Sequence, residues 1–97
     1  GSIDYHVVKL PETPPTNQNH GAQVAWAKSL GGKLANKREM RLIQANLQDT
    51  LPTSGWCWLE EENGSSDAWV CYFLHGGDIY SNRSAGGGAV AVRRFNP

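Results

Sequence analysis

The stretch GWCWLEEENGSSDAWVCYF, residues 55–73, constrains the fold more than any other part of the chain. It holds three of the four tryptophans and both cysteines. Two aromatic, β-prone runs flank Asn63-Gly64, a dipeptide that favours a tight turn between antiparallel strands. The stretch therefore predicts a β-hairpin.

If the turn is centred on Gly64, residues at equal sequence distances before and after Gly64 pair with one another. This predicts the pairs Trp58 with Val70, Trp56 with Tyr72 and Cys57 with Cys71. Alternation then divides the side chains between two faces. One face is expected to hold Trp56, Trp58, Val70 and Tyr72, and the other Cys57, Leu59, Trp69, Cys71 and Phe73.

The rest of the chain divides into a helical first half and a second half of strands and turns, so we expect an α+β fold. Apolar spacing predicts a helix over 20–30 that faces the core through Ala22, Ala25, Trp26, Ser29 and Leu30 and ends at Gly31-Gly32. Asn36 and Glu39 form a capping-box pattern for a second helix to about residue 48, whose expected core face is Met40, Leu42, Ile43 and Leu47.

Strands are expected at 3–10, 55–60, 67–73, 78–82 and 89–95. Residues 1–2 read as a cloning scar, and 3–97 as a single domain.

Composition excludes several classes of function. Nine acidic and nine basic residues give a formal net charge of zero, which argues against a sequence-independent nucleic-acid binder and against an acidic DNA mimic. No apolar run approaches the length of a membrane helix, about 18 residues, so no membrane insertion is expected. The short chain, its two cysteines and the lack of a signal peptide favour the cytoplasm.

Four segments in order resemble the C-type-lectin-like fold, and in particular the short bacterial and phage proteins of the DUF1566 family. They are AWAKSLGGKLANKREMRLI (25–43), GWCW (55–58), DAWV (67–70) and AVAVRRF (89–95). The resemblance implies two helices packed on a small twisted antiparallel sheet, with the N- and C-terminal strands adjacent. It also implies recognition as the function, since most relatives are receptor-binding proteins or adhesins, while one branch contains formylglycine-generating enzymes.

The cysteines, histidines and glycines of the chain do not form a known catalytic or metal-binding motif. Cys57 and Cys71 allow a cross-strand disulfide or a reduced, half-buried pair, and the latter is favoured. A catalytic thiol would need a base, and the nearest histidine in sequence is His75. No metal-ligand spacing or phosphate loop is present, and the glycines of 84–89 predict a flexible loop or bulge. No catalytic residue, metal or cofactor is therefore expected.

The sequence thus favours a non-catalytic domain, encoded by a phage or prophage, that binds a protein partner through the loop-rich side of its sheet. An exposed tryptophan or tyrosine is the expected interface anchor, and Arg93 and Arg94 are expected to point to opposite sides, one toward the acidic hairpin tip. The predicted partner-binding residues are Trp58, Glu60, Glu61, Glu62, Asp67, Tyr72, Asp78 and Arg83. In the favoured role the domain inhibits a host defence complex in the bacterial cytoplasm. The alternatives are a receptor-binding or adhesin module on a virion or cell surface and a small metal- or thiol-dependent enzyme, and the oligomeric state stays open.

Overall fold

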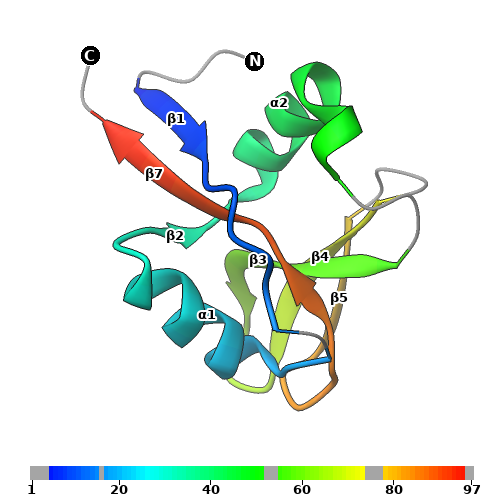
Figure 1. Ribbon diagram of the computed structural model, residues 1–97. Coiled ribbons are helices and arrows are strands. Elements are labelled where there is room, and N and C mark those ends of the chain that lie inside the picture. The colour runs from blue at the N-terminus through cyan, green and yellow to red at the C-terminus, as the bar shows by residue number, and fades with distance from the viewer. Residues whose placement is uncertain (1–4, 16, 52–54, 74–77, 96–97) are drawn as a thin grey trace.

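Two ten-residue helices and seven strands form an α+β fold in a computed structural model that describes residues 5–15, 17–51, 55–73 and 78–95 (Figure 1). The helices are α1 (His20–Ser29) and α2 (Lys37–Asn46), followed by a 3-10 turn, η1 (Gln48–Thr50). The strands are β1 (His6–Lys9), β2 (Lys33–Leu34), β3 (Trp56–Asn63), β4 (Asp67–Tyr72), β5 (Asp78–Asn82), β6 (Gly88–Ala89) and β7 (Ala91–Phe95). Among these, β2 and η1 were not predicted from the sequence.

The strands form two sheets, where the sequence predicts one antiparallel sheet. One sheet has the order β1-β7-β2, and the other has the order β5-β4-β3-β6. All pairs are antiparallel except β3 with β6. The predicted last strand is divided at Val90, so β6 pairs with β3 while β7 joins β1 and β2. The N- and C-terminal strands are thus adjacent, as the resemblance implies.

The hairpin of β3 and β4 has the predicted pairs, although its turn is not where the sequence places it. Trp58 pairs with Val70, but nearer the tip Glu62 pairs with Ala68. The tip is therefore centred one residue later than Gly64, at Ser65, since 62 and 68 are equidistant from it. Between the two pairs β3 advances four residues and β4 advances two, and this bulge restores the predicted register.

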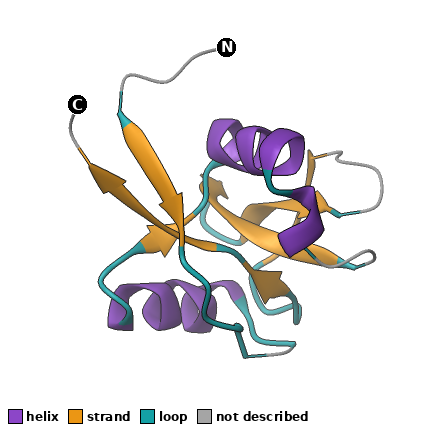
Figure 2. Ribbon diagram, turned by 45° about the horizontal axis from the view of Figure 1, so that its top comes forward, coloured by secondary structure: helices purple, strands orange, loops and turns teal. Residues whose placement is uncertain are grey.

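Both faces of this hairpin are buried, each beneath a different helix (Figure 2). Cys57, Leu59 and Cys71 share a core cluster with Met40 and Ile43 of α2. On the opposite face the cluster consists of Trp58, Val70, Ala68 and Ala89 together with Ala27 of α1, Leu34 and Ala91. The predicted division of the hairpin side chains between two faces is confirmed.

The predicted core face of α1 is correct for Trp26 and Leu30, which pack partly buried against the core, but polar side chains occupy two of the three most buried positions. His20, Gln23 and Ala27 are buried, whereas Ala25 and Ser29 are exposed. The Gln23 Nε2 donates to the carbonyls of Pro15 at 2.7 Å and Gly87 at 2.9 Å. These bonds satisfy the Nε2 of the buried amide, whereas its Oε1 has no hydrogen-bond partner within the described residues.

The capping box of α2 is confirmed, while its core face is narrower than predicted. The Asn36 side chain accepts from the Glu39 N–H, and the Glu39 side chain accepts from the Asn36 N–H, both at 2.8 Å. Met40 and Ile43 are buried, but Leu42 and Leu47 are 36% and 42% exposed. The helix ends at Asn46, so Leu47 is its C-cap and lies outside the buried face, directly before η1.

The glycine run before β7, which the sequence predicts to be a flexible loop or bulge, is closely packed. Gly87 is buried and exchanges two backbone hydrogen bonds with Gln18, of 3.2 and 2.8 Å. A Cβ at Gly87 would lie only 2.3 Å from the Trp56 ring. Glycine is required here because the backbone lies directly against an indole.

Candidate functional site

The three consecutive glutamates of the hairpin are tied to three different parts of the fold. Glu60 forms an ion pair with Arg94 at 3.0 Å. Glu61 accepts from the Lys37 N–H at the start of α2 through both oxygens, at 3.0 and 3.1 Å, where the helix dipole also favours a carboxylate. Glu62 pairs with an arginine at 3.3 Å. The acidic segment predicted as a partner-binding tip therefore has structural contacts of its own.

Arg83 is the arginine that holds Glu62, and it locks the hairpin tip to the loop after β5. Its Nε donates to the Asp67 carbonyl at 3.1 Å, and its Nη2 donates to the Gly64 carbonyl at 2.6 Å. In addition, the backbone N–H of Arg83 donates to the Ser66 carbonyl. With its guanidinium engaged on three sides, Arg83 positions the tip.

A buried carboxylate at Glu39 anchors the second arginine, Arg94. Arg94 donates to Glu39 at 2.6 and 2.7 Å, and the Tyr5 hydroxyl donates to the same carboxylate at 2.8 Å. Burial alone raises the pKa of Glu39, yet the hydrogen bonds from Arg94, the Asn36 N–H and Tyr5, with the charge of Arg94, outweigh it and hold the pKa below the usual 4.5. The hydrogen bond to Glu39, followed by that to Glu60, raises the pKa of Arg94. Arg94 thus points toward the acidic hairpin, as predicted.

Trp58 is fully buried, so the expectation that it is an exposed interface anchor is corrected. Its exposed fraction is 0%, and its Nε1 donates to the Gln18 carbonyl at 3.0 Å. The ring meets His20 and Trp56 edge-on, with centroids 5.3 and 5.0 Å away. A large indole with a satisfied N–H belongs to the core of a small domain, which explains why its sequence position alone was misleading.

The remaining predicted residues lie around β4 and β5. Tyr72 is 40% exposed, in agreement with the expectation that an aromatic ring remains on the surface. Asp67 is half-buried at the start of β4. Asp78 begins β5 opposite Cys71, and its side chain lies outside the described part of the structure.

Large apolar side chains gather where the four-stranded sheet ends. We call Trp69, Tyr72, Ile79 and Tyr80 the β5 edge surface. Ile79 and Tyr80 are 46% and 53% exposed and, as neighbours in one strand, point to opposite faces. Tyr80 pairs with Trp69 and meets its ring edge-on at 5.6 Å. The Lys37 ammonium lies 3.5 Å from the centre of the Trp69 ring, which fixes that indole further.

Sequence reasoning missed Ile79 and Tyr80, although a signal existed. The short strand over 78–82 was predicted, and it contains two adjacent large apolar residues. In a half-buried strand one of two neighbours faces water, and at the edge of a sheet the covering elements can leave part of the other side chain accessible as well. Without the strand order the sequence does not show that β5 is the edge strand.

The strands of the two sheets carry charges of opposite sign. In the β1-β7-β2 sheet the charged and histidine positions of the strands are His6, Lys9, Lys33, Arg93 and Arg94. In the β5-β4-β3-β6 sheet they are Glu60, Glu61, Glu62, Asp67 and Asp78. Arg94 of β7 forms an ion pair with Glu60 of β3, so part of the opposite charge of the two sheets is neutralised within the molecule.

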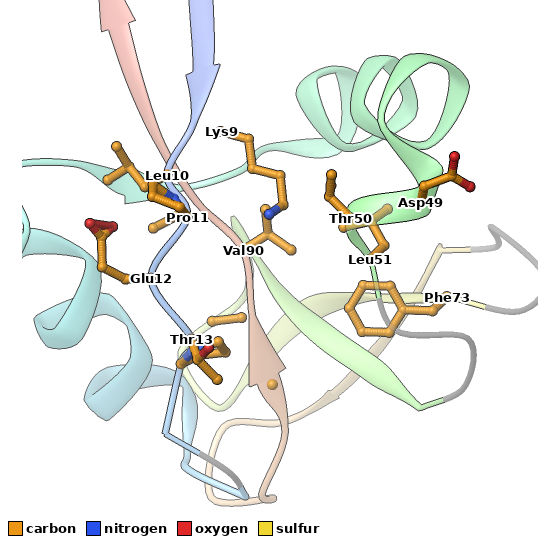
Figure 3. A pocket seen from close by; sticks show the side chains of 14 residues that line it. Lys9, Leu10, Pro11, Glu12, Thr13, Asp49, Thr50, Leu51, Phe73 and Val90 are labelled. Atoms are coloured by element: carbon orange, nitrogen blue, oxygen red, sulfur yellow. The ribbon is translucent and has the colours of Figure 1, made fainter.

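A cavity of about 350 Å³ opens away from the β5 edge surface, between the segment that begins at the end of β1 and the end of η1 (Figure 3). The segment from Lys9 to Pro14 forms one wall. Asp49, Thr50, Leu51 and Phe73 form the opposite wall, and the chain from Gly88 to Ala91 forms the floor. This cavity was not predicted from the sequence, because its lining comes from four segments far apart in the chain.

The cysteines lie opposite one another, as predicted, and both are buried. Their exposed fractions are 0% for Cys57 and 1% for Cys71, so neither thiol meets solvent. His75, the histidine considered as a base, falls outside the described residues. Within the ranges that the structure describes, no group of three or more His, Cys, Asp or Glu side chains is arranged to hold a metal ion.

No helix in the described part of the chain has the length and apolar character needed to cross a membrane. In comparisons with known proteins, no family model matches the chain, and no curated protein matches it.

Proposed function

We propose that this chain is a non-catalytic recognition domain of C-type-lectin-like type, and that it binds a protein partner through the β5 edge surface. The observation that carries the proposal is an edge strand with large apolar side chains exposed on both faces, Ile79 on one and Tyr80 on the other. Protein interfaces are enriched in aromatic residues, and their binding energy concentrates in a few such anchors.

The geometry favours a partner that adds an extended segment to β5. In the described part of the chain, β5 pairs with β4 on one side and with no strand on the other. Backbone groups along such an edge give affinity, and side-chain contacts above and below it give specificity. The edge-on contact between Trp69 and Tyr80 and the position of Lys37 hold two rings in place before binding, which lowers the entropy cost of association.

The proposal places the domain inside a bacterial cell that carries a phage or prophage, where it inhibits a host defence complex. Two cysteines are too few for a disulfide-dense extracellular scaffold of this size, which favours the intracellular setting. The rival setting is a receptor-binding or adhesin module on a virion or cell surface. In either setting the same surface makes the contact, so one set of variants addresses both.

An affinity capture experiment with tagged protein and lysate of a candidate bacterial host tests the proposal. The double variant Ile79→Ser, Tyr80→Ser removes both exposed anchors of β5. Leu47→Ser is the matched control, because Leu47 is 42% exposed and lies beyond α2. We expect wild type and control to retain a stoichiometric intracellular complex and the double variant to lose it while it still unfolds cooperatively.

Other outcomes of this experiment count against specific parts of the proposal. Equal capture by the double variant would exclude the β5 edge surface as the interface. Capture of envelope glycans or outer-membrane proteins would replace the intracellular setting with the adhesin setting. Capture of no protein above an unrelated bait would contradict the recognition function.

A further inference from the structure

The cavity of Figure 3 exists because the ladder between β1 and β7 is interrupted. The Leu10 N–H donates to the Ala91 carbonyl at 2.9 Å, and the next residue is Pro11, which has no N–H to continue the ladder. The chain returns to the sheet at Gln18, which bonds to Gly87. Between these two connections the segment leaves the sheet and opens a space over residues 88–91.

The cavity has an apolar lining with one cation above it. Leu51 and Phe73 are half-buried and pack against the core cluster that contains Val90. Lys9 is half-buried, and Figure 3 shows its side chain extending over Val90. The aromatic, branched and aliphatic side chains suit the apolar part of a small ligand.

The Lys9 ammonium has no hydrogen bond or ion pair with any residue in the described part of the chain. The nearest acids in the lining do not neutralise it, because in Figure 3 the carboxylates of Glu12 and Asp49 point away from the cavity. The Thr50 hydroxyl donates a hydrogen bond to the Leu47 carbonyl at 2.7 Å. A half-buried cation beside an apolar surface is best satisfied by an anion that enters with the ligand.

We infer that this cavity binds a carboxylate attached to an apolar group about as large as a phenyl or isobutyl group. The carboxylate accepts from the Lys9 ammonium, and the apolar group lies against Leu51, Phe73 and Val90. A volume of about 350 Å³ is near the lower end for small-molecule sites, which selects a compact ligand. The same chemistry occurs in a free organic acid and in the C-terminal residue of a peptide. The inference does not rest on the proposed function, because no residue of the β5 edge surface lines the cavity.

Two-dimensional NMR titration with phenylacetate tests the inference. We expect saturable shifts at Leu51, Phe73 and Val90. The neutral isostere phenylacetamide should bind at least about tenfold more weakly, since a hydrogen bond to a charged group contributes that much. Lys9→Met, which keeps the aliphatic stem, should weaken phenylacetate binding by the same factor. Lys33→Met, which changes an exposed lysine outside this cavity, should leave the affinity unchanged.

Two further probes distinguish the sources of the carboxylate. Tighter binding of N-acetyl-Gly-Phe than of phenylacetate, lost in its C-terminal amide, would assign the site to a peptide terminus. Weaker binding of the dipeptide would assign it to a free acid. Absence of saturable shifts at the three lining residues, or equal binding of phenylacetate and phenylacetamide to the wild type, would overturn the inference. The latter comparison holds even if Lys9→Met fails to fold, and neither result bears on the β5 edge surface.

Discussion

Replacement of Glu39 by glutamine is the sharpest test of what stabilises this fold. Each Glu39 oxygen accepts two hydrogen bonds: Oε1 from the Asn36 N–H and Arg94 Nη2, and Oε2 from the Tyr5 hydroxyl and Arg94 Nε. A glutamine side chain has the same shape but presents an NH₂ group in place of one oxygen. Whichever way the amide turns, two of the four donors lose their acceptor.

The structure sets the expected size of the effect. Glu39 is 0% exposed, so the loss occurs at a buried site where each hydrogen bond to the carboxylate contributes about 1.5–3 kcal/mol. The loss is moderated because the Arg94 side chain is 24% exposed and keeps its contact with Glu60. We therefore expect Glu39→Gln to lower the free energy of unfolding by about 2–4 kcal/mol, a large part of the stability of a small domain.

Urea unfolding of wild type and variant at several pH values checks both the size and its cause. Because the pKa of Glu39 is lowered in the folded state, its contribution is present above the usual value of 4.5 and is lost as the pH falls through the lower folded pKa. The difference between the two proteins should therefore be largest near neutral pH and narrow in acid. Glu60→Gln is the control, since the Glu60 side chain is 38% exposed and its pair contributes about 0–1 kcal/mol.

Two results would refute this reasoning. A destabilisation of Glu39→Gln no larger than that of Glu60→Gln would show that the buried network contributes no more than an exposed ion pair. A difference that stays constant between about pH 7 and pH 3 would show that the ionised form of Glu39 is not the source of the stability.

Three further substitutions test local features by denaturant unfolding. Gly87→Ala places a Cβ 2.3 Å from the Trp56 ring and should cost about 1–3 kcal/mol with a changed near-ultraviolet tryptophan spectrum; an unchanged midpoint would contradict the close packing. Asn36→Ala removes the α2 cap and should cost about 1 kcal/mol, with no loss if the capping box does not form in solution. Gln23→Met leaves the Pro15 and Gly87 carbonyls without their amide donor and should cost about 1–3 kcal/mol, whereas a stabilised variant would show that an apolar α1 face suffices.

Local signals in the sequence were sufficient wherever the contact itself is local. The α2 cap follows from Asn36 and Glu39, three residues apart, and the hairpin follows from Asn63-Gly64 between two β-prone runs. The pairing of Cys57 with Cys71 was predicted correctly from a turn placed one residue too early, because the bulge in β3 compensates for the later turn. Alternation still identified the two faces, since the compensation moves the register by an even number of residues.

Contacts between distant segments decided the features that the sequence did not reveal. Gln23 is buried in α1 because carbonyls at Pro15 and Gly87 accept its hydrogen bonds, and the second of these is 64 residues away. Glu60 is held by an arginine 34 residues further along. A pattern of helical spacing ranks glutamine as exposed, because it contains no information on partners brought in by the fold.

The ties made by Glu60, Glu61 and Glu62 also determine how recognition can be tested. Each of these side chains connects the hairpin to another segment: β7 through Arg94, the start of α2, and the loop after β5 through Arg83. Substituting them together would loosen the sheet, so a loss of binding would not distinguish an interface from a fold. Ile79 and Tyr80 lie at the edge of the same sheet with about half of their surface exposed, where a serine removes contact area and leaves the internal ties in place. A partner that recognises this domain through shape and apolar contact will therefore respond to changes in β5 that leave the contacts of Glu60, Glu61 and Glu62 in place.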